Sequence, residues 1–82
     1  MWSELLPKCV GGTIEDHDAP GQAAGITGYT LMDDWVEVQT ADGWGFGGKL
    51  GMTGIIAGPS PSTFVMRSPY MAATITMPTD KP

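Results

Sequence analysis

Glycine and proline interrupt this sequence so often that the stretches between them are too short for long helices. The chain has 82 residues, of which 12 are glycine and 7 are proline. Both residue types break helices and weaken the interior of strands. Short stretches bounded by such turn residues are typical of strands joined by tight turns. The sequence therefore predicts an all-β fold.

Three stretches alternate apolar and polar residues with the period of a half-buried strand. These stretches are residues 35–40, 63–68 and 70–77. In the first, Val36 and Val38 face one side, whereas Glu37 faces the other. Two further β-prone stretches are residues 26–32 and 52–57. Gly28 inside the first of these two indicates a bulge or a close approach of the backbone.

Strands in this number cannot leave both faces of a sheet bare. We therefore expect a small curled antiparallel sheet or an SH3-like β-barrel of about four to six short strands. The sequence runs from a Val-Glu-Val strand through a loop to Gly-Met-Thr-Gly-Ile-Ile, a turn and Phe-Val-Met-Arg. This order resembles the KOW-type and other SH3-like barrels, in which a glycine precedes a short apolar strand. The resemblance covers about half of the chain and implies a six-strand barrel.

The first third of the chain shows no sustained period of either kind. Residues 1–25 are expected to form an extended N-terminal arm and loop, and residues 26–82 a single small β domain. A helical turn can start at Trp2, but Pro7 is expected to end it. The apolar side chains of this turn, expected to pack on the sheet or on a neighbouring subunit, are Trp2, Leu5 and Leu6.

The charge balance is acidic, with nine Asp and Glu residues against four Lys and Arg residues and a formal net charge of −5. Such a chain repels the phosphate backbone of nucleic acid on average, so nucleic acid is not an expected partner. Wholly apolar runs such as residues 55–57 are far below the roughly 20 residues of a membrane span. The sequence predicts no secretion signal, no membrane partner, and a location in a virion or in the host cytoplasm.

Catalytic and metal-binding motifs are weak. Cys9 and His17 are the only thiol and imidazole, and no helix N-terminus is expected near Cys9 to activate it. An acidic stretch starting at Asp16 begins like a calcium loop, but Pro20 and Thr27 stand where oxygen ligands are required. We therefore predict no enzyme activity, no cofactor and no metal.

Two aromatic residues, Trp44 and Phe46, lie between glycines in a segment expected to be a loop. Their rings either plug the core of the sheet or contact a partner, and tryptophan is enriched at the energetic centre of interfaces. We expect a partner contact here. The predicted partner-binding residues are Trp44, Phe46, Trp35, Trp2, Leu5 and Leu6.

Together, these features predict a non-enzymatic structural or interaction protein that docks, in multiple copies, onto other protein subunits of an assembly. Its most concrete form is a virion component, either a capsid cement or decoration protein, a head–tail connector or a tail protein. The first alternative is a small inhibitory or regulatory protein-binding module that uses an acidic surface and the aromatic loop. The second alternative is an SH3-like or KOW-like nucleic-acid-associated module.

Overall fold

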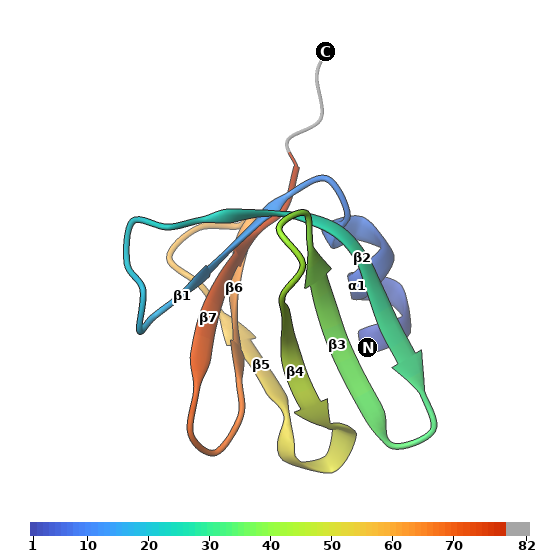
Figure 1. Cartoon of the computed structure of the whole chain (residues 1–82). Coiled ribbons are helices and arrows are strands. Elements are labelled where there is room, and N and C mark those ends of the chain that lie inside the picture. Colours follow the sequence, from blue (N-terminus) through green and yellow to red (C-terminus); the bar gives the residue numbers. More distant parts are fainter. Residues whose placement is uncertain (79–82) are drawn as a thin grey trace.

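The protein folds into one curved antiparallel sheet with a short helix beside it (Figure 1). A computed structural model describes residues 1–78. Its elements are α1 (Trp2–Cys9), β1 (Thr13–Asp16), β2 (Ala24–Met32), β3 (Trp35–Thr40), β4 (Gly45–Lys49), the 3-10 helix η1 (Leu50–Met52), β5 (Gly54–Ala57), β6 (Thr63–Arg67) and β7 (Ala72–Thr76). The order across the sheet is β4-β3-β2-β1-β7-β6-β5, so the sheet ends at β4 and β5. The prediction of an all-β fold built on a curled antiparallel sheet is confirmed.

Two of the seven strands lie where the sequence predicted arm or loop. Strand β1 occupies the middle of the sheet between β2 and β7, and Ile14 pairs with Ile75 in the core. Strand β4 is the segment expected to be the glycine-rich loop, and it pairs with β3 along its whole length. The six-strand barrel is therefore not formed, because within residues 1–78 the sheet has seven strands and its two edge strands do not pair with each other.

The helix α1 replaces the first part of the expected extended arm. Pro7 lies inside this helix and does not end it, so the prediction on this point is wrong. An interior proline costs about 3 kcal/mol, but burying a leucine side chain contributes about 1.5–3 kcal/mol, and α1 buries both Leu6 and Cys9. Because proline has no N–H, the carbonyl of Ser3 lacks its helical hydrogen-bond donor. Ser3 is exposed to water. The helix lies against β2 (Figure 1).

The core fills the inner face of the curved sheet. The alternation predicted for three strands is confirmed, since every second residue is buried, namely Val36 and Val38, Phe64 and Met66, and Ala73 and Ile75. The bulge expected at Gly28 is also confirmed, because the pairing of β2 with β3 shifts between Ile26 and Gly28. The β domain predicted over residues 26–82 includes residues 79–82, which lie outside the described residues.

Candidate functional site

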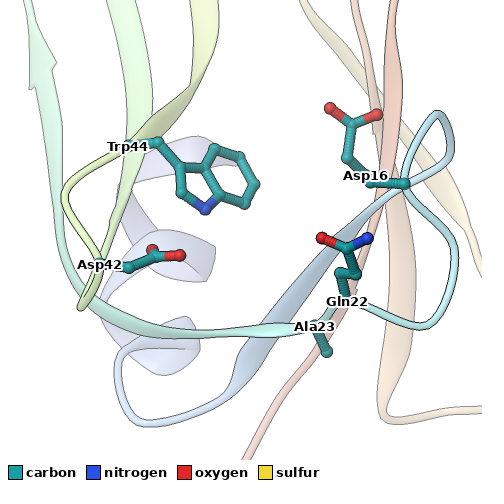
Figure 2. A pocket seen from close by; sticks show the side chains of 6 residues that line it. Asp16, Gln22, Ala23, Asp42 and Trp44 are labelled. Carbon is teal, nitrogen blue, oxygen red and sulfur yellow. The ribbon is translucent and has the colours of Figure 1, made fainter.

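A cleft of about 260 Å³ opens between the β1–β2 loop and the β3–β4 turn. Its lining residues are Asp16, Ala19, Gln22, Ala23, Asp42 and Trp44. Figure 2 shows the Trp44 ring and the Asp42 carboxylate on one wall, with Asp16 and Gln22 on the opposite wall. We call this hollow the Trp44 cleft. Two carboxylates therefore share it with one aromatic ring.

The β3–β4 turn sets the positions of Asp42 and Trp44. Gly43 has a φ of 92°, a left-handed conformation that glycine adopts without strain. The backbone N–H of Thr40 donates to the Trp44 carbonyl at 2.9 Å, which closes the turn. The buried Thr40 hydroxyl donates to Asp42 Oδ1 at 2.6 Å and accepts from the Trp44 N–H at 3.2 Å. One carboxylate oxygen of Asp42 is thereby held, and the other stays available to a ligand.

The opposite wall is the end of β1 and the loop that follows it. Asp16 pairs with Ala73, which is buried, so its side chain lies on the inner face of the sheet. Asp16 Oδ1 accepts from the Asp18 N–H at 2.9 Å. Glu15 Oε2 accepts from the Gly21 N–H at 2.7 Å and ties the far side of the loop to β1. The loop therefore carries its own hydrogen bonds and holds Asp16 at the cleft.

A second hollow, of about 280 Å³, lies between the start of α1, the β2–β3 turn and η1. Its lining residues are Met1, Trp2, Ser3, Leu31, Met32, Asp33 and Leu50. We call it the Trp2 groove. The Leu50 N–H donates to the Asp34 carbonyl at 2.8 Å, which fastens η1 to the turn. Because the lining side chains are mostly apolar and include one carboxylate, this groove suits an apolar ligand surface better than a charged one.

Edge strand β5 is the third surface that a partner can reach. All four of its residues are exposed, including Ile55 at 38% and Ile56 at 50%. Hydrogen-bonded pairs alternate along an antiparallel ladder. Gly58 N–H donates to the Thr63 carbonyl, so the next bonded pair is Ile56 with Val65. Ile55 and Ala57 therefore turn their backbone N–H and C=O groups towards the free edge.

The predicted partner-binding residues lie in different environments. Phe46 is 3% exposed and Leu6 is fully buried, so both belong to the core and offer a partner no surface. Trp44 lines the cleft and Trp2 lines the groove. Leu5 is partly buried against the core. Trp35 is exposed, and its indole N–H donates to Glu37 Oε1 at 3.0 Å.

The structure brings two of these residues to the same end of the sheet. Trp35 pairs with Met32, and Met32 lines the groove together with Trp2. Trp44 and Phe46 lie two residues apart on the inner side of the sheet. Phe46 fills the core beside Val38, and Trp44 is partly buried against that core and also lines the cleft.

Sequence reasoning missed the two carboxylates of the cleft. From the sequence, Asp16 belongs to an acidic stretch for which no metal is predicted, and no role is predicted for Asp42. A signal for the second was present, because Asp-Gly between two strands is a strong indication of a tight hairpin, and Asp42–Gly43 forms the β3–β4 turn. No local signal places Asp16 opposite Trp44, since that proximity comes from the sheet order.

Cys9 and His17 have different partners in the structure. The Cys9 thiol donates to the Leu5 carbonyl at 3.3 Å inside α1, and His17 Nε2 lies 2.8 Å from Thr74 Oγ1. Burial raises the pKa of the Cys9 thiol to about 11. The nucleophilic form of cysteine is the thiolate, so at neutral pH this thiol is a protonated, small apolar side chain. Cys9 is one of the buried residues of the core.

Comparison with known proteins finds no family model that matches this chain, no similar curated protein and no similar solved structure. Among residues 1–78, no helix has the length and apolar character needed to cross a membrane. Within the same residues, no group of three or more His, Cys, Asp or Glu side chains could hold a metal ion. Function is therefore argued from the cleft, the groove and the β5 edge.

Proposed function

We propose that this protein is a non-enzymatic interaction subunit whose copies dock into a larger protein assembly. Its most concrete form is a virion component, such as a capsid cement protein, a head–tail connector or a tail protein. The single observation that carries the proposal is the β5 edge, an exposed apolar edge strand whose outward backbone groups have no partner within residues 1–78.

Natural proteins protect sheet edges with charged residues, prolines, bulges or a covering segment. A short edge strand is a further protection, and β5 is only four residues long; its sequence, Gly-Ile-Ile-Ala, contains none of the protecting residues. Ile55 and Ala57 direct N–H and C=O groups outward, as inferred above from the ladder. A strand from another subunit would pair with these groups and would cover Ile56. Although the chain has a net charge of −5, β5 itself is uncharged, so an approaching copy meets no charge on this strand.

The test is sedimentation velocity over a concentration series, comparing the wild type with Ala57→Pro. Proline removes an N–H that points to the free edge and breaks no bond within the sheet. We expect the wild type to associate as concentration rises, and Ala57→Pro to remain monomeric with an unchanged far-UV spectrum. Ala57→Ser is the matched control, because it keeps the N–H and should associate like the wild type. A wild type that stays monomeric throughout, with a cooperative melt, contradicts the proposal.

The Trp44 cleft favours a second candidate, a small regulatory or inhibitory module that binds a basic protein site. The cleft presents Asp16 and Asp42 beside an aromatic ring. Stoichiometry separates the two candidates. Quantitative mass spectrometry of complexes purified from the native source should find many copies per particle for an assembly subunit, and one copy per target for a regulator.

A further inference from the structure

We infer that the Trp44 cleft receives an arginine side chain of the partner protein. The inference rests on the proposed role as an interaction protein and specifies the chemistry of its partner. The ligand would place its guanidinium in the space between Asp16 on one wall and Trp44 and Asp42 on the other. The lining residues and the view in Figure 2 put these three groups around one space.

The charge of the lining residues favours a cationic ligand. It contains two carboxylates and no basic side chain, in a chain with a net charge of −5. Each carboxylate uses one oxygen to accept an internal hydrogen bond, from the Thr40 hydroxyl to Asp42 and from the Asp18 N–H to Asp16. Those bonds orient both groups, and each retains a second oxygen for a ligand. An indole ring attracts a cation placed over its face, by about 0.5–2 kcal/mol.

The size and composition of the cleft favour a side chain over a metal ion or a cofactor. A calcium ion needs about six to eight oxygen ligands, whereas Asp16 and Asp42 are the two carboxylates of this lining. Sites for drug-sized ligands usually hold about 300–1,000 Å³, and this cleft, at about 260 Å³, is smaller. The head of one long side chain fits such a volume.

Arginine suits the cleft better than lysine. Its planar guanidinium stacks on an aromatic face and donates in the plane to carboxylates at the same time. The ammonium of lysine is a compact, strongly hydrated charge without a flat face. The Trp44 ring on one wall and the carboxylates on both walls match the planar cation.

The experiment is an NMR titration of the full chain at low ionic strength with the peptide acetyl-Gly-Ser-Arg-Ser-Gly-amide. The chain has three tryptophans, so each indole N–H gives its own signal. We expect the Trp44 indole and the amides of residues 16–19, 21–23 and 42–44 to shift, and the indoles of Trp2 and Trp35 to stay. The same peptide with citrulline in place of arginine lacks the charge and should cause no shift. The lysine peptide should bind more weakly than the arginine peptide.

Charge-neutral variants test the carboxylates while keeping the acceptor oxygens of the native hydrogen bonds. Asp16→Asn and Asp42→Asn should each weaken binding by up to about fivefold, the range of an exposed ion pair. Glu37→Gln is the matched control, because Glu37 also lies beside a tryptophan, Trp35, but lines neither hollow. It should bind like the wild type. Trp44→Phe keeps a ring and should bind better than Trp44→Leu.

Three outcomes overturn the inference. The first is an equal shift with the citrulline peptide, and the second is a shift distributed evenly over the acidic surface. The third is unchanged binding by the double variant of Asp16→Asn and Asp42→Asn. None of these depends on the β5 edge, so association blocked by Ala57→Pro would still support the proposed function. Conversely, a monomeric wild type that binds the arginine peptide would overturn the assembly role and leave the cleft assignment standing.

Discussion

The two free edges of the sheet are built in opposite ways. Edge strand β4 buries Phe46 in the core, and its backbone runs so close to β3 that a Cβ at Gly47 would collide with the Val36 carbonyl oxygen. Edge strand β5 exposes every residue, and a Cβ at Gly54 would meet nothing. An edge that is anchored from inside contributes to stability, whereas an exposed apolar edge is free to contact a partner. Strand β4 therefore contributes to stability, and β5 is the edge at which we propose association.

The largest expected effect comes from removing the anchor of β4. Phe46→Ala should destabilise the protein by about 3–5 kcal/mol, because a buried phenylalanine leaves both lost apolar burial and a cavity. Urea unfolding followed by far-UV circular dichroism measures this change. The control on the other edge is Ile56→Ala, which should cost less than about 1 kcal/mol because half of that side chain is already exposed. Similar costs for the two variants would contradict the difference between the edges.

A smaller loss of stability is expected from adding a single methyl group to β4. In Gly47→Ala the new Cβ would lie 2.7 Å from the Glu37 Cα as well as against the Val36 carbonyl. Both neighbours are backbone atoms of β3, so the strands must separate locally. We expect a cost of about 2–3 kcal/mol, at the upper end of overpacking effects. An unfolding midpoint equal to that of the wild type would show that β4 is not held tightly to β3.

The side chains that each strand carries explain which strands could be predicted from the sequence. Strands β3, β6 and β7 were found because one face of each meets the core, so apolar residues such as Val36 and Phe64 recur at every second position. Strand β4 has the sequence Gly-Phe-Gly-Gly-Lys and contains too few side chains to alternate. Its extended conformation comes from pairing with β3, which is a tertiary effect that local propensity does not report.

The helix α1 and the Trp44 cleft illustrate two other reasons why the sequence-based prediction was incomplete. The apolar pattern of α1 was readable, because Trp2, Leu5 and Cys9 follow the i, i+3, i+7 spacing of one helical face. The prediction gave more weight to Pro7 than to this pattern. The cleft could not be predicted, because Asp16 ends β1 whereas Trp44 lies in the β3–β4 turn, and the two meet only when the sheet forms. Of the cleft residues, the sequence therefore pointed to Trp44 alone.

On the β5 side, a charge should affect association far more than folding. Ile56→Lys places a cation on the outer face of the free edge, and edge lysines are a common device against strand addition. We expect the association constant from sedimentation to fall at least about tenfold, which corresponds to about 1.4 kcal/mol. The free energy of unfolding should change by less than about 0.5 kcal/mol, as for other surface substitutions.

The control for this variant is Ile56→Thr, which is also β-branched but carries no charge. It should retain most of the association. If Ile56→Lys associates like the wild type, the β5 edge is not the contact, and the difference between the two edges has no consequence for assembly.

The smallest effect is expected from the glycine of β5, which is the counterpart of Gly47. A Cβ added at Gly54 has no neighbour within 4 Å. Alanine also reduces the conformational freedom of the unfolded chain, so Gly54→Ala should stabilise the protein by about 0.5 kcal/mol. Urea unfolding of Gly47→Ala and Gly54→Ala under the same conditions makes the same chemical change at both edges. The two variants should differ in sign, and a loss of more than about 1 kcal/mol at Gly54 would mean that β5 is packed as closely as β4.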